Sequence, residues 1–273
     1  MRTPHGSAPA APDWAPRWSD ERGQPLAEGA RTDAGLLLRR RGGDLLRFAH
    51  EGGAVELWPS RENPVLHAHV VLDLAVPLEL SRRGPLVFHG AVVESGGRAI
   101  AVLGDSGAGK STVAAAWAAR GGRFLADDWF VAEEEGRGFR VRPTHPSLRV
   151  GLGTPAPAGE RLFADLAMPE ARGRRWLVVS PESALFATSR LPLEKIVVWK
   201  RSSEVDGATG RRLSTSETMD ALLRAFFALE LESAALWADS LPRLGVLADR
   251  CEGVEIAVAD GFEGLEAGIA LLA

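Results

Sequence analysis

The chain has 273 residues, enough for one large domain or two small ones with a sizeable core. Its 32 lysines and arginines against 36 aspartates and glutamates give a formal net charge of -4, so no overall positive field would attract nucleic acid or an anionic membrane. The single cysteine, Cys251, excludes an intramolecular disulfide and a cysteine-based metal cluster.

Residues 1–32 are rich in Pro, Ala, Gly and charge and show no apolar periodicity. Such a composition predicts a loosely ordered arm. The segment also lacks the uninterrupted apolar run of a signal peptide, and a reducing compartment fits the single cysteine, so we expect a cytoplasmic protein.

Residues 33–84 are expected to form a small N-terminal β-rich subdomain with a linking helix. Three short β-rich pieces, at 36–39, 45–49 and 54–58, are separated by glycine pairs, which is typical of a β-meander. Apolar residues at helical spacing over 63–83 then predict a helix, which Gly84-Pro85 would end.

A hairpin opens the second part of the chain, residues 85–273. The β-rich runs 86–93 and 99–103 flank Glu94-Ser95-Gly96-Gly97, and a two-residue Gly96-Gly97 turn would place His89 opposite Gly104. A helix over 111–119 and a short strand at 124–126 complete a strand–helix–strand unit.

The segment between this hairpin and the helix matches the phosphate-loop pattern G-x-x-x-x-G-K-[ST], also called Walker A. Its glycines let backbone N–H groups turn toward an anion, the helix N-terminus adds partial positive charge, and Lys110 would reach the β- and γ-phosphates of ATP. The Ser111 hydroxyl is placed to ligate Mg²⁺. The predicted nucleotide-binding residues are Gly104, Asp105, Ser106, Gly107, Ala108, Gly109, Lys110, Ser111 and Thr112.

Two adjacent carboxylates, Asp127 and Asp128, follow the short strand at 124–126. Ligands of open α/β sheets bind at the carboxyl ends of strands, so we expect the pair to face the phosphate loop. One carboxylate would hold Mg²⁺ while the other accepts a proton from an attacking hydroxyl. The simpler alternative is a single Mg²⁺-binding aspartate with a capping neighbour.

The rest of the chain predicts further α/β elements. Ser214-Thr215-Ser216-Glu217 is a capping box that opens a helix to about Leu231. The basic cluster Arg172, Arg174 and Arg175 is compatible with phosphate or substrate contacts and equally with a solvated loop. The other expected elements are strands near 129–132, 139–142, 196–199 and 254–258, and helices at 241–250 and 262–272.

These motifs resemble the C-terminal catalytic domain of the HPr kinase/phosphorylase family and related serine kinases. The resemblance rests on His89-Gly90 followed by a hairpin, on the phosphate loop and on Leu125-Ala126-Asp127-Asp128, in that order and spacing, and covers about 85–153. It implies an α/β P-loop kinase domain that uses ATP and Mg²⁺ to phosphorylate a serine hydroxyl. It also implies that Asp127 is the base, that His89 orients it, and that Asp128 assists with metal or charge.

The sequence departs from this family at its downstream signature. Where the bifunctional enzymes carry an acidic E-x-R-G motif, this chain has Ser147-Leu148-Arg149-Val150, which leaves open whether it has phosphorylase activity and whether HPr is its substrate. Related kinases phosphorylate ribosomally made peptide precursors, including lasso peptides, and we expect a peptide or protein acceptor. The sequence leaves open a kinase for a small hydroxyl metabolite such as free serine, a nucleotide-gated regulatory module, and the oligomeric state, a homo-oligomer included.

Overall fold

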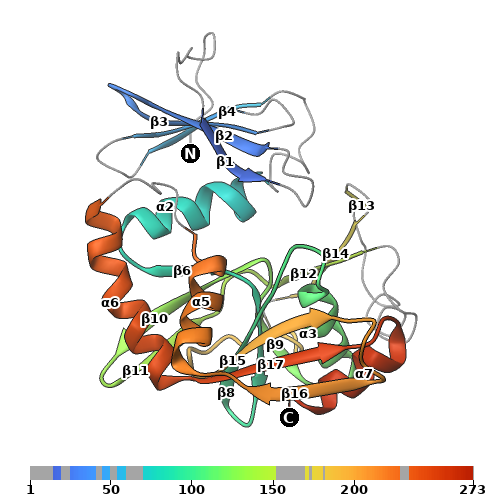
Figure 1. Ribbon diagram of the computed structural model, residues 1–273. Coiled ribbons are helices and arrows are strands. Elements are labelled where there is room, and N and C mark those ends of the chain that lie inside the picture. Colours follow the sequence, from blue (N-terminus) through green and yellow to red (C-terminus); the bar gives the residue numbers. More distant parts are fainter. Residues whose placement is uncertain are drawn as a thin grey trace. The chain divides into compact units, whose positions relative to one another are not determined.

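The computed structural model describes residues 15–19, 25–40, 45–49, 54–59, 70–151, 170–171, 174–180, 182–227 and 234–272 (Figure 1). Among these residues the chain divides into two compact units, the first ending at Arg83 and the second beginning at Gly84. Each is described by itself. No helix within the described ranges is both long and apolar enough to cross a membrane.

The first unit contains one antiparallel sheet in which the strands lie in chain order. A short π-helix, η1 (Val71–Ala75), and α2 (Val76–Arg82) follow it. The strands are β1 (Ala15–Ser19), β2 (Pro25–Thr32), β3 (Gly35–Arg40), β4 (Leu45–Ala49) and β5 (Val55–Trp58). The predicted meander is confirmed in β3 to β5, and the predicted helix is confirmed from residue 70 onward, since 60–69 lie outside the described residues.

The expectation of a loosely ordered arm over residues 1–32 is wrong for its second part, because Ala15–Ser19 and Pro25–Thr32 are strands. The β2 strand is hard to recognise because small residues, Gly29 and Ala30, occupy its buried positions and leave no apolar alternation. Residues 1–14 lie outside the described residues.

The second unit is a mixed α/β fold around a nine-stranded sheet, in which β15 pairs in parallel with both β8 and β17. Seven strands follow one another in the order β6-β10-β11-β15-β8-β7-β9. The other two extend the sheet from β15, since β17 pairs with β15 and β16 pairs with β17. The strands are β6 (Leu86–His89), β7 (Ala91–Ser95), β8 (Arg98–Leu103), β9 (Arg123–Ala126), β10 (Trp129–Glu135), β11 (Gly138–Arg142), β15 (Leu191–Arg201), β16 (Ala208–Arg212) and β17 (Glu252–Val258).

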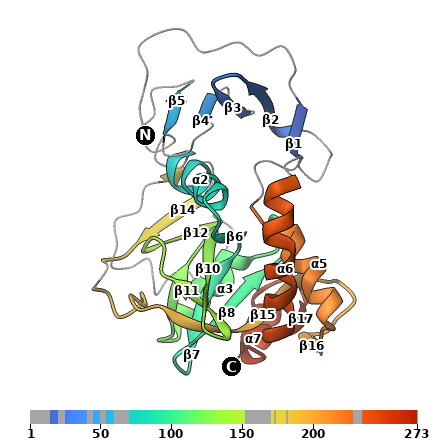
Figure 2. The same ribbon diagram turned by 90° about the vertical axis from the view of Figure 1, so that its left-hand side faces the viewer.

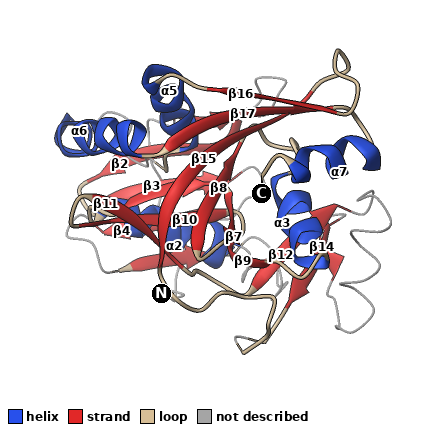
Figure 3. Cartoon of the chain, turned by 90° about the horizontal axis from the view of Figure 1, so that it is seen from below, coloured by secondary structure: helices blue, strands red, loops and turns tan. Residues whose placement is uncertain are grey.

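Helices lie on both faces of this sheet, and a small second sheet lies beside α3 (Figures 2 and 3). Figure 3 shows α3 and α7 on one side of the long strands and α5 and α6 on the other. The helices are α3 (Lys110–Ala119), α5 (Thr215–Ala225), α6 (Ala234–Arg250) and α7 (Phe262–Ala270); the small sheet contains β12 (Ser147–Gly151), β14 (Arg174–Val178) and β13 (Glu170–Ala171) in that order.

The predicted hairpin register is confirmed, since Ser95 pairs with Arg98 and Ala91 with Val102 across the Gly96-Gly97 turn. The placement of His89 opposite Gly104 is wrong, because the single strand expected over 86–93 breaks at Gly90. A Cβ at Gly90 would lie 2.9 Å from the Val102 carbonyl oxygen, so the chain approaches β8 too closely there for any side chain. His89 pairs instead with Trp129 of β10.

The predicted strand–helix–strand unit is present as β8, α3 and β9, with β7 inserted between its two strands. Because β7 is antiparallel to both neighbours, β8 and β9 run in the same direction. Their carboxyl ends therefore lie at the same edge of the sheet, which brings the residues after Leu103 and those after Ala126 together.

Two helices differ from their predicted bounds. The capping box at Ser214 and Glu217 is present, but α5 ends at Ala225 and not near Leu231. The chain turns extended at Phe226, and the Phe227 N–H donates to the Val87 carbonyl of β6, which replaces the next helical hydrogen bond. Helix α6 begins at Ala234, before its predicted start, and carries Pro242 inside it.

Two glycines within helices, Gly268 of α7 and Gly245 of α6, provide a test of how α7 packs against the sheet. A Cβ at Gly268 would lie 2.4 Å from the Trp199 ring, whereas one at Gly245 of α6 meets nothing within 4 Å. We expect Gly268→Ala to lower the free energy of unfolding by about 1–3 kcal/mol through overpacking. Gly245→Ala should raise it by about 0.5–1 kcal/mol through helix propensity. Urea unfolding of both variants measures this, and equal effects would contradict the packing described.

Candidate functional site

The glycine-rich loop, defined as residues 104–111, connects the end of β8 to the start of α3. Gly104 has a φ of +148°, and a Cβ there would lie 2.4 Å from the Trp199 carbonyl oxygen of β15. Only glycine therefore lets the loop leave the sheet this close to β15. From there the chain reaches α3, whose first turn presents backbone N–H groups without intrahelical partners.

Lys110 places a positive charge inside this loop. The side chain is buried, and its Nζ donates to the carbonyl oxygens of Gly104 at 2.8 Å and Asp105 at 3.0 Å. Burying an ammonium is costly unless it is hydrogen-bonded, and the loop supplies that compensation through its own backbone. The cation is thereby held next to the α3 N-terminus, where an anion would find both charge and N–H donors.

Ser111 connects the first turn of α3 to the carboxylate that ends β9. Its hydroxyl donates to Asp127 Oδ1 at 2.8 Å, and the backbone N–H of Arg149 in β12 donates to Asp127 Oδ2 at 2.7 Å. Asp127 is only 1% exposed. Both of its oxygens are therefore engaged from opposite sides, one by the helix and one by the small sheet.

Burial is the largest effect on Asp127 and raises the pKa of its carboxyl. The Arg149 N–H, the charge of Arg149, the Ser111 hydroxyl and the charge of His145 each lower that pKa, but together they do not offset the desolvation. A nearby divalent cation would favour the ionised carboxylate in the same way as these groups.

Asp128 differs from its neighbour in backbone and in partners. Its φ of 68° is the one positive value at a non-glycine position among the described residues, and its backbone carbonyl accepts from the Gly90 N–H at 3.1 Å. The carboxylate forms an ion pair with the guanidinium of Arg149, and both side chains are about nine-tenths buried. Sparsely populated backbone conformations of this kind cluster at functional sites.

Arg149 contacts both aspartates, one through its backbone and the other through its side chain. The sequence singled out this residue only as part of a departure from a family signature, and no pattern within 147–150 marked it as a site residue. Its partners lie more than twenty positions earlier, so only the pairing of β12 with β14 and the fold around β9 bring them together.

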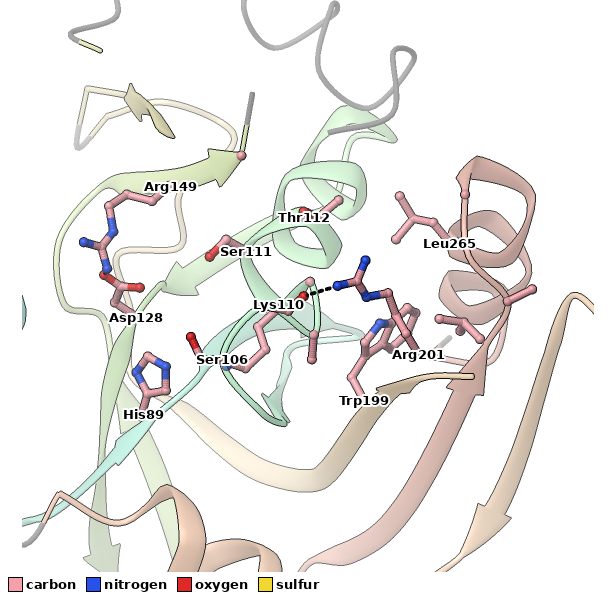
Figure 4. A pocket seen from close by; sticks show the side chains of 17 residues that line it. His89, Ser106, Lys110, Ser111, Thr112, Asp128, Arg149, Trp199, Arg201 and Leu265 are labelled. Atoms are coloured by element: carbon pink, nitrogen blue, oxygen red, sulfur yellow. Dashed lines mark hydrogen bonds and ion pairs between the residues drawn. The ribbon is translucent and has the colours of Figure 1, made fainter. Parts of the chain in front are cut away.

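These residues surround a cavity of about 440 Å³ (Figure 4). His89 and Asp128 lie on one side of it, and Trp199, Arg201 and Leu265 lie on the other, with Ser106, Lys110 and Ser111 between them. The lining residues are His89, Ser106, Gly107, Ala108, Gly109, Lys110, Ser111, Thr112, Asp128, Arg149, Gly151, Trp199, Arg201, Val258, Ala259, Gly261 and Leu265. The volume lies in the range of small-molecule and cofactor sites.

The structure brings most of the predicted site residues to this cavity. Gly104 and Asp105 line a second cavity next to it, and Asp127 lines neither, because it lies behind Ser111. Arg172 lies outside the described residues, and Arg174 and Arg175 belong to β14, where only the backbone is described.

The side of the cavity formed by β15, β17 and α7 was not predicted from the sequence. The Arg201 guanidinium donates to the Gly107 carbonyl at 2.8 Å and so reaches the loop from a neighbouring strand. Trp199 and Leu265 add apolar surface beside it. The strand over 196–199 was expected, but its parallel pairing with β8, which brings Arg201 to the loop, leaves no local sequence signal.

Within the described ranges, no group of three or more His, Cys, Asp or Glu side chains is arranged to hold a metal ion. A Mg²⁺ ion bound together with nucleotide phosphates needs only one or two protein ligands. Ser111 and Asp127, with a hydroxyl and a carboxylate oxygen 2.8 Å apart next to the loop, fit that smaller requirement.

No protein-family model and no curated protein matches the chain. Among solved structures, the Hpr(Ser) kinase/phosphatase from Coxiella burnetii is similar, with 10% sequence identity and a TM-score of 0.36. The match covers 68% of this chain and 93% of that one. At this identity and TM-score, evidence for function has to come from the residues of the site.

The raised pKa of Asp127 predicts a pH dependence of stability. The native state holds the proton more tightly than the unfolded chain, so the free energy of unfolding should fall as pH rises from about 4 toward the native pKa. Asp127→Asn has no carboxyl proton to lose, so its free energy of unfolding should rise relative to that of the parent over that range. Urea unfolding at a series of pH values measures it.

The matched control is Asp206→Asn, which changes an exposed aspartate in the same way. Its unfolding is measured over the same series of pH values, which separates the effect of burial at Asp127 from that of the substitution itself. A pH-independent difference between Asp127→Asn and the parent would contradict the assignment of a raised pKa to this carboxyl.

Proposed function

We propose that this protein is a P-loop kinase that uses ATP and Mg²⁺ to phosphorylate a serine hydroxyl of a peptide or protein. The observation that carries the proposal is the hydrogen bond from Ser111 to Asp127, which joins the glycine-rich loop to a strand-end carboxylate. That juxtaposition of a loop hydroxyl and an acidic residue is what nucleotide-bound Mg²⁺ requires.

The nucleotide phosphates would bind over the loop and the α3 N-terminus. Lys110 supplies the cation there, and the backbone N–H groups of the loop supply donors that need no further ordering. Trp199 and Leu265 offer apolar surface for the rest of the nucleotide, and Arg201, already held at Gly107, adds a second positive charge.

Ser111 would hold the metal from the cavity wall and Asp127 through its bond to Ser111, and the metal would neutralise charge on the nucleotide phosphates. Asp127 is suited to this because it is positioned through both of its oxygens and lies behind Ser111, away from an incoming acceptor. The roles expected from the sequence are therefore exchanged in this proposal, with Asp127 on the metal side.

Asp128 is then the base, because it lines the cavity next to His89. The serine oxygen bonds to the γ-phosphorus, its proton passes to the Asp128 carboxylate, and the bond to the leaving ADP breaks. His89 would orient the acceptor hydroxyl or the carboxylate. Arg149 holds Asp128 in place and adds positive charge close to the transferred group.

Lys110→Ala tests the nucleotide site. It removes the buried cation while the backbone of the loop stays, so we expect affinity for ATP to fall and phosphoryl transfer to be lost. Isothermal titration with ATP and transfer of label from γ-labelled ATP to candidate peptides and to free serine measure the two effects. Normal turnover in this variant would contradict the proposal, and ATP binding by the parent without transfer to any acceptor would favour a regulatory module.

The two aspartates should give different kinetic defects. Asp128→Asn keeps the size of the side chain but cannot take the proton, so single-turnover transfer should fall by roughly two to four orders of magnitude with little change in ATP affinity. Asp127→Asn should instead weaken Mg²⁺-dependent binding of ATP and be partly rescued by excess Mg²⁺. The reverse pattern would restore the roles expected from the sequence.

A further inference from the structure

A second cavity, of about 760 Å³, borders the first half of the glycine-rich loop. It shares His89 and Ser106 with the proposed nucleotide cavity, and one face of α5 forms its far wall. Because the two cavities meet at His89, a molecule in the second cavity would present a group to the place where the γ-phosphate is proposed to lie. A binding site for the acceptor must place the acceptor hydroxyl next to the γ-phosphate in this way.

The size of this cavity favours an acceptor larger than one amino acid. Sites of about 300–1,000 Å³ bury ligands of drug size, so the volume fits several linked residues and exceeds the need of free serine. Its walls combine residues of the strands β8, β15, β16 and β17 with residues of α5.

The charges in the cavity indicate what kind of segment would bind. Four carboxylates and three cations line it, one negative charge in excess. The cations are all held in ion pairs within the wall: Lys200 with Glu255, Arg211 with Glu255 and Glu217, and Arg224 with Asp220.

Asp105 is the exception among the lining carboxylates, because it forms no ion pair with any residue that the structure describes, although its charge reaches Arg224. It lies in the glycine-rich loop itself, directly before Ser106, which lines both cavities. ATP bound in the adjacent cavity would add further negative charge at the same place. A positively charged group beside the acceptor hydroxyl would therefore gain favourable electrostatic energy.

We propose that this cavity binds the acceptor as an extended peptide segment, with a lysine or arginine next to the phosphorylated serine and directed toward Asp105. This inference rests on the proposed kinase function. To that function it adds three points: the acceptor is a peptide, the second cavity binds it, and the bound segment is positively charged beside the serine.

The first test blocks the cavity. Ala221 lines it from the middle of α5, and Ala221→Trp should raise the KM for a peptide acceptor by at least about tenfold while affinity for ATP is unchanged. The control is Thr215→Trp, at an exposed position of the same helix that lines neither cavity. ATP titration and a thermal melt show whether each variant is folded.

The second test changes the charge of the cavity wall and keeps the volume of the cavity. Asp220→Asn should reduce the preference for a basic neighbour of serine by about two- to fivefold, measured with γ-labelled ATP and a library of peptides that have one central serine. Its control is Asp239→Asn on α6, because Asp239 is as exposed as Asp220 and also pairs with an arginine one helical turn away, but lies outside the cavity.

The outcomes separate this inference from the kinase function itself. If the parent phosphorylates peptides and Ala221→Trp leaves the peptide KM unchanged, the cavity is not the acceptor site, although the kinase function stands. A preference for acidic neighbours, or free serine used as well as the best peptide, would also overturn the inference. If the parent binds ATP but labels neither peptides nor serine, the kinase function fails first, and the acceptor site with it.

Discussion

The bond between Ser111 and Asp127 is the interaction on which the site depends. It can form only because β8 and β9 run in the same direction and end at one edge of the sheet, with the glycine-rich loop leaving one end and the aspartates leaving the other. A buried carboxylate needs partners for both of its oxygens, and Arg149 of the small sheet supplies the second. The same carboxylate thus connects the loop, the main sheet and β12.

The most completely buried charged side chains lie at one place in the second unit, and the Glu79–Arg82 pair of the first unit is about nine-tenths buried. Lys110, Asp127 and Asp128 are the charged side chains that are buried in the described part of the chain, and all three lie at the loop or directly behind it. Elsewhere, ion pairs such as those of Arg224 and Arg243 are at least partly exposed. Because desolvating charges destabilises a fold, their burial here marks this place as a candidate functional site.

Sequence alone could predict the features that depend on neighbouring residues. The Gly96-Gly97 turn fixed the hairpin register, and the spacing between loop, helix and Asp127 placed the carboxylates at the loop. Features that depend on contacts between residues far apart in the chain could not be predicted from the sequence. The break at Gly90 follows from its approach to Val102, the end of α5 from the bond of Phe227 to Val87, and the role of Arg149 from two partners far away in the chain.

The end of α5 also connects the walls of the two cavities. The Phe227 N–H bonds to Val87, and its ring meets that of His89 edge-on at 6.1 Å, so the helix that forms the wall of the second cavity is fastened to the strand that carries His89. His89 in turn pairs with Trp129, next to Asp128, whose carbonyl is bound by Gly90. Phe227 thus connects the helix that lines the second cavity to His89, and the pairing of His89 with Trp129 extends this connection to Asp128.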